Sequence, residues 1–135
     1  MIEHIEANGR RIFALVLILP MLLIACGGGD VTATLCGHFG TLDSALGRLP
    51  EVNADTEIQG FKTQLSAVGA TADLIANVNE NYTGVSTLLS AYNNVDGLIN
   101  SIDGETIGDR APGVEGAVKS LRDAGTGVIE SIDCN

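Results

Sequence analysis

The sequence predicts an all-α protein, a small antiparallel four-helix bundle that follows a cleaved signal peptide. Apolar residues recur three and four positions apart in four separate stretches of residues 31–135, which is the spacing of one face of a helix. The stretches are similar in length, as an antiparallel bundle requires, and Pro, Gly or Asn residues lie between them. A chain of 135 residues is one domain's worth, so residues 31–135 are expected to share one core.

The amino-terminal segment has the layout of an export signal. Arg10 and Arg11 precede an apolar run from Ile12 to Ala25 that only Pro20 interrupts. As a helix this run would span about 21 Å, whereas a membrane-spanning helix needs roughly 20 residues and about 30 Å. The pattern therefore favours a signal peptide over residues 1–25 that is removed during export, rather than a retained membrane anchor.

The end of this segment, Leu23-Ile24-Ala25-Cys26, resembles the lipobox of bacterial lipoproteins, and the match covers residues 1–29. The resemblance implies cleavage between Ala25 and Cys26, with palmitate-type acyl chains on the new amino-terminal Cys26. Two or three chains would hold the protein at a membrane, because each buried methylene adds about 0.8 kcal/mol. Residues 26–30 would then be a lipidated cysteine and a glycine spacer. The implied location is the outer face of the cytoplasmic membrane or the outer membrane.

The first helix is expected from about Val31 to Leu49. Asp30 is placed to cap its first turn with a carboxylate, and Pro50 would stop it. The expected apolar stripe consists of Leu35, Phe39, Leu42, Leu46 and Leu49.

The second and third helices are separated by the stretch Asn77–Gly84, which is rich in residues that compete with helical hydrogen bonds. Thr56 and Gln59 form a candidate capping box at the start of the second helix. The second stripe is Ile58, Phe61, Leu65, Val68, Ala72, Ile75 and then Val78 or Asn79. The third stripe is Val85, Leu88, Tyr92, Val95, Ile99 and Ile102.

One alternative architecture stays open at this stage. Tyr82 keeps the apolar phase across the Asn-rich stretch, so a single helix from Asp55 to Asp103 is compatible with the periodicity. Such a helix would be about 70 Å long and would give a three-element bundle.

The last helix is expected to start at Pro112, a favoured first helical residue, after an acidic loop over residues 105–111. Its stripe is Val114, Val118, Leu121, Val128 and Ile132, with Gly125 in the gap of the series. Glycines inside the helices, such as Gly60, Gly69, Gly97, Gly116 and Gly125, are interpreted as close packing or tolerated surface positions.

The number of cysteines supports the four-helix bundle independently of the apolar pattern. Of three cysteines, lipidation would use Cys26, which leaves Cys36 and Cys134 in an oxidising compartment, so we predict that they are paired. In a four-helix up-and-down bundle these two positions lie at the same end. A metal site from Cys36, His38 and Cys134 is disfavoured, because structural zinc takes four ligands.

The net charge of the protein limits the kinds of partner that it can bind. Asp and Glu outnumber Lys and Arg by 17 to 7, and residues 1–25 hold two of each sign, so the net charge of −10 belongs to the rest of the chain. Such a surface disfavours nucleic acid and electrostatic adhesion to anionic lipids. Carboxylates that fall off the apolar stripes are expected on solvated helix faces: Asp43, Asp73, Asp96, Asp123 and Glu130.

No residue pattern predicts catalysis or a cofactor. His38 is the sole histidine after residue 25, and no nucleophile is paired with it in the sequence. The acidic loop from Asp103 fails as an EF-hand, since Ile107 and Val114 stand where oxygen ligands are required. We therefore expect a non-enzymatic, lipid-anchored envelope protein that contacts another envelope component or has a structural role. The alternative is a module that binds a small ligand or metal ion between helices.

Overall fold

The computed structural model of the chain describes residues 31–134. The fold described below is that of the second of two units into which the chain divides, Thr32–Asn135. The predicted cleavage after Ala25, the lipidation of Cys26 and the capping role of Asp30 lie outside the described residues.

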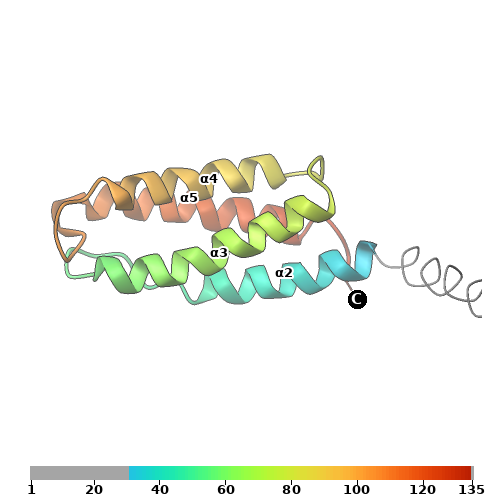
Figure 1. Ribbon diagram of the computed structural model, residues 1–135, viewed down its shortest axis with the longest axis horizontal. Coiled ribbons are helices and arrows are strands. Elements are labelled where there is room, and N and C mark those ends of the chain that lie inside the picture. Colours follow the sequence, from blue (N-terminus) through green and yellow to red (C-terminus); the bar gives the residue numbers. More distant parts are fainter. Residues whose placement is uncertain (1–30, 135) are drawn as a thin grey trace, which may run out of the picture. The chain divides into compact units, whose positions relative to one another are not determined.

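The second unit is an antiparallel bundle of four helices, in which each helix runs opposite to the one before it (Figure 1). The elements are α2 (Val31–Gly47), α3 (Ile58–Val78), α4 (Val85–Asn100), the short 3-10 helix η1 (Gly108–Arg110) and α5 (Ala111–Ile129). Residues 31–134 contain no strand, only one isolated bridge between Glu57 and Thr106. The predicted all-α class is confirmed.

The junction between α3 and α4 excludes the three-element alternative. The backbone of Asn79 is extended, and its side-chain oxygen accepts a hydrogen bond from the amide of Asn81 at 3.1 Å. Gly84 then adopts the left-handed conformation, with φ of 86°, immediately before α4. A single helix from Asp55 to Asp103 is therefore wrong, because local side-chain bonding and a left-handed glycine interrupt it.

The core is built largely from the predicted stripes, although the predicted members Tyr92, Ile102 and Ile132 are only half-buried at its edge. Phe39, Phe61 and Leu121 are its largest members from three of the helices, and each is at most 2% exposed. Burying a side chain of this size contributes about 1.5–3 kcal/mol relative to leaving it exposed. The buried apolar residues are Leu35, Phe39, Leu42, Ala45, Leu46, Leu49, Ile58, Phe61, Leu65, Val68, Ala72, Ile75, Val85, Leu88, Val95, Ile99, Ile107, Val114, Ala117, Val118, Leu121 and Val128.

Two glycines allow side chains from other helices to approach the backbone. The Tyr92 ring of α4 occupies the space that a Cβ would take at Gly69 of α3, and Leu46 of α2 does the same at Gly125 of α5. The last apolar stripe has a glycine at position 125 because the side chain of Leu46 occupies the space beside its backbone. A Cβ would meet no atom within 4 Å at three other predicted positions, Gly60, Gly97 and Gly116.

The start of α3 differs from the prediction. Glu57 is the N-cap residue, and no side chain caps the helix, so the predicted capping box is wrong. Thr56 instead serves the preceding loop, where its hydroxyl accepts from the amide of Asn53 at 2.9 Å and donates to the carbonyl of Glu51 at 3.1 Å.

Candidate functional site

The first predicted site residues, Cys36 and Cys134, form a disulfide bond with a Cα–Cα distance of 5.6 Å. Cys36 lies in the second turn of α2, and Cys134 follows the end of α5. Figure 1 shows the start of α2 and the carboxyl end of the described chain together at one end of the bundle. Both sulfurs are used in this bond, so the alternative metal site with His38 is excluded as a thiolate site.

Tyr82 closes the same end of the bundle. It lies in the loop between α3 and α4, and its ring centroid is 5.8 Å from that of Phe39 in α2. Its hydroxyl is 2.7 Å from the hydroxyl oxygen of Ser131, in the tail after α5. We call this arrangement the clasp end: the start of α2, the α3–α4 loop and the tail after α5. The one sequence signal for this packing of Tyr82 is that it continues the apolar spacing across the Asn-rich stretch.

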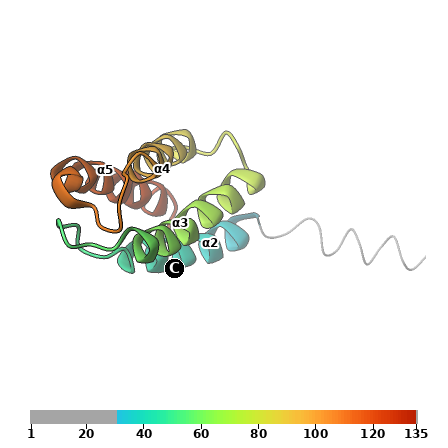
Figure 2. The same ribbon diagram turned by 60° about the vertical axis from the view of Figure 1, so that its left-hand side comes forward.

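The opposite end consists of two loops that are hydrogen-bonded to each other. The amide of Ile58 donates to the carbonyl of Glu105 at 2.9 Å, and the amide of Ile107 donates to the carbonyl of Thr56 at 3.0 Å. Figure 2 turns this end forward and shows the loop before α3 beside the loop before α5. We call it the loop end.

The acidic residues of the loop end do not form a cation site in the structure. Ile107, at the fifth position of the EF-hand alignment, is 1% exposed and belongs to the core. Nowhere in residues 31–134 do three His, Cys, Asp or Glu side chains gather as a group able to hold a metal ion. The exposed carboxylates of this end are Glu51, Asp55, Glu57, Asp103, Glu105 and Asp109.

A surface cleft of about 450 Å³ lies between residues 50–52, just after α2, and residues 112–122 of α5. Its lining combines apolar residues with four charged side chains. The lining residues are Pro50, Glu51, Val52, Pro112, Glu115, Gly116, Val118, Lys119 and Arg122. No pattern in the sequence predicts this cleft, because its two walls are far apart along the chain.

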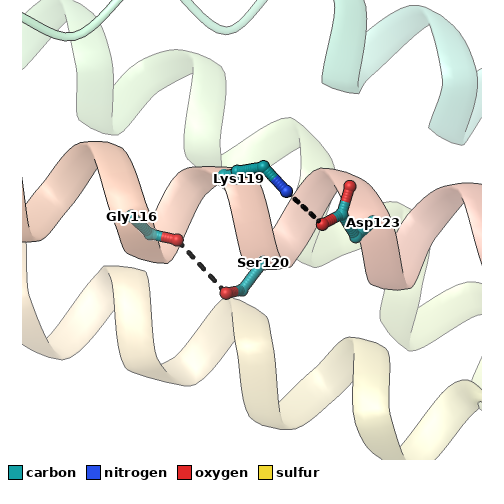
Figure 3. A network of polar contacts seen from close by, with 4 residues as sticks. All are labelled: Gly116, Lys119, Ser120 and Asp123. Carbon is teal, nitrogen blue, oxygen red and sulfur yellow. Dashed lines mark hydrogen bonds and ion pairs between the residues drawn. The ribbon is translucent and has the colours of Figure 1, made fainter.

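Arg122 joins the two walls of the cleft. Its Nη2 donates to the backbone carbonyl of Leu49 at 3.0 Å, across 73 positions of sequence. Lys119, one turn earlier on α5, lies 2.9 Å from a carboxylate oxygen of Asp123 in an exposed ion pair (Figure 3). On the same helix Ser120 donates to the carbonyl of Gly116 at 3.2 Å. The guanidinium of Arg122 therefore bonds to a neutral carbonyl, whereas the ammonium of Lys119 already has a carboxylate.

The phenol of Tyr92 is partly buried, and its ring lies against Gly69 of α3. Partial burial raises the pKa of its phenol above the ordinary value of 10.0, and the carboxylates of Asp96 and then Asp73 raise it further. Each of these effects disfavours the phenolate. The phenol is neutral at physiological pH in any case, so this shift indicates packing rather than chemistry.

The remaining predicted carboxylates lie outside the apolar stripes. Asp43, Asp73, Asp123 and Glu130 are exposed, and Asp96 is half-buried beside Tyr92. His38 is half-buried on α2.

In comparisons with known proteins, no family model, curated protein or solved structure matches the chain. Among the helices of residues 31–134, none combines the length and the apolar character needed to cross a membrane.

Proposed function

We propose that the chain is a lipid-anchored protein of the bacterial cell envelope, attached through acyl chains on Cys26, with a non-catalytic structural or protein-interaction role. The observation that carries the proposal is the order Arg10-Arg11, apolar run, Leu23-Ile24-Ala25-Cys26. The disulfide between Cys36 and Cys134 supports it, because such bonds persist in compartments outside the cytoplasm.

The geometry of the bundle is compatible with attachment at the clasp end. Cys26 precedes the first residue of α2 by five positions, and five extended residues reach about 18 Å. The clasp end would therefore be held near the lipid surface, and the disulfide would fix the tail after α5 at that end as well. With α3 about 31 Å long, the loop end would project away from the membrane. The face available to a partner would be the loop end and the cleft near it.

The non-catalytic part of the proposal is supported by the chemistry of the described residues. Both thiols of residues 31–134 are bonded to each other, so neither is a nucleophile. Apart from the half-buried Asp96, the carboxylates of residues 31–134 are exposed, and most lie in loops rather than in paired, buried environments. A second candidate function, the binding of a small ligand, is favoured by one observation, the cleft at Arg122.

The test is a Cys26→Ser variant compared with a Gly28→Ala variant in the bacterial host. The proposal predicts that the unaltered protein and Gly28→Ala sediment with membranes and enter the detergent phase on Triton X-114 partitioning. Cys26→Ser should accumulate as a longer, unlipidated precursor, and globomycin should produce the same precursor from the unaltered protein. Unchanged processing and partitioning of Cys26→Ser would contradict the proposal.

A further inference from the structure

The cleft between residues 50–52 and α5 has the size of a small-ligand site. Its volume of about 450 Å³ falls within the range of about 300–1,000 Å³ that ligand sites occupy. Pro50, Val52, Pro112 and Val118 supply apolar surface from both walls. The two prolines hold their backbone angles rigidly, so this part of the lining is largely preformed.

Charges of both signs line the cleft, although the protein as a whole is acidic and Lys119 is paired with Asp123 beside the cleft. Glu51 and Glu115 contribute two carboxylates, and Lys119 and Arg122 contribute two cations. Only five Lys and Arg residues follow position 25, against fifteen Asp and Glu. Two of these five cations line this one cleft. A ligand with net negative charge would be repelled by the acidic protein, whereas a ligand that carries one charge of each sign would not.

The charges also have an order along α5. Glu115 precedes Arg122 by seven residues, which corresponds to about 10.5 Å along a helix. Three extended residues of a bound peptide span about 10 Å, so its two termini would match this separation.

Arg122 is the better carboxylate partner of the two cations. It can donate five hydrogen bonds in a planar fork, and its one bond across the cleft, to Leu49, is to a neutral carbonyl. Lys119 is already paired with Asp123. The bond to Leu49 also holds the guanidinium in place, which lowers the conformational entropy lost when a ligand binds.

We propose that this cleft binds a short apolar peptide of about three residues with free termini, its carboxylate on Arg122 and its ammonium near Glu51 and Glu115. The apolar side chains of the peptide would lie against Pro50 and Pro112. All the residues that line the cleft lie within the bundle. The proposal therefore does not depend on lipidation of Cys26.

The experiment is calorimetric titration of the protein, purified from its bacterial host in a nonionic detergent, with the peptide Ala-Leu-Ala. The expected result is saturable binding of one peptide with a dissociation constant of about 1 mM or tighter. Blocking the carboxylate as an amide, or the amine as an acetamide, should weaken binding about tenfold or more, because each removes one charge pair.

Variants of α5 supply the matched control. A Cβ built at Gly116 or at Gly127 would meet no atom within 4 Å, but only Gly116 lines the cleft. Gly116→Leu should therefore weaken binding about tenfold or more, whereas Gly127→Leu should leave it unchanged, and both should keep the helical circular dichroism of the unaltered protein. Arg122→Gln should reduce the affinity for Ala-Leu-Ala and abolish its preference over the amide.

Three results would overturn the proposal. They are the lack of saturable binding to the unaltered protein, equal affinity for the free and blocked peptides, and equal affinity of the Gly116→Leu and Gly127→Leu variants.

Discussion

Removing the disulfide tests how the bundle is stabilised. The double variant Cys36→Ser/Cys134→Ser keeps both positions small and polar but deletes a cross-link between residues 98 apart in sequence. A closed loop of this length removes about 16 cal/mol/K of entropy from the unfolded chain, which corresponds to about 4.7 kcal/mol at 25 °C. Measured bridges usually give less, so we expect the free energy of unfolding to fall by about 2–4 kcal/mol.

The assay is urea unfolding at 25 °C followed by helical circular dichroism. For a protein of this size the free energy falls by about 1–2 kcal/mol per molar urea, so the midpoint should drop by more than about 1 M. Adding dithiothreitol to the unaltered protein should produce the same drop. The Cys26→Ser variant is the matched control, since it removes a cysteine but keeps the bridge, and its midpoint should not change.

A midpoint that stays the same in the double variant and in the reduced protein would refute the reasoning. It would mean that the unfolded chain does not gain the freedom that the entropy argument assigns to it when the bridge is removed.

Two further predictions concern local packing and acidity. Gly40→Ala in the middle of α2 should raise the free energy of unfolding by up to about 1 kcal/mol, because its Cβ would meet open space and alanine favours a helix. Gly84→Ala should lower it by about 1–2 kcal/mol, because φ of 86° is strained for any residue with a Cβ; urea midpoints measure both effects. In a Tyr82→Phe background, ultraviolet titration should show Tyr92 ionising above pH 10.0, and Asp96→Asn should lower that midpoint. Since the folded pKa is raised, the stability that Tyr92 contributes is present below pH 10 and is lost as the pH rises through the folded value.

Each of these predictions has a contradicting result. Gly40→Ala and Gly84→Ala shifting the urea midpoint in the same direction would contradict the backbone argument. A Tyr92 midpoint at or below 10.0 would contradict the partial burial of the phenol, and no response to Asp96→Asn would show that the two side chains do not interact.

The helices could be read from the sequence because each buries a single apolar face. All five residues of the first predicted stripe are buried, although α2 itself ends at Gly47 and Leu49 is buried from the turn after it. The pairing of Cys36 with Cys134 was also predictable, because the antiparallel topology and the cysteine count pointed to the same pair.

The misjudged details depend on contacts between distant parts of the chain. Thr56 has the spacing of a capping residue, but its loop pairs with residues 105–108, roughly 50 positions later in the sequence, and its hydroxyl is used inside the loop. The cleft depends on the bond from Arg122 to Leu49, and no local pattern encodes a contact across 73 positions. The role of Gly125 likewise required knowing that Leu46 lies opposite it.

Mass spectrometry of the protein purified from bacterial membranes tests the central claim, attachment through Cys26, most directly. We predict that the amino-terminal peptide begins at Cys26 and carries the added mass of two or three acyl chains, with Cys36 and Cys134 still bonded to each other. An amino-terminal peptide that begins at Met1 and contains an unmodified thiol at Cys26 would contradict the account.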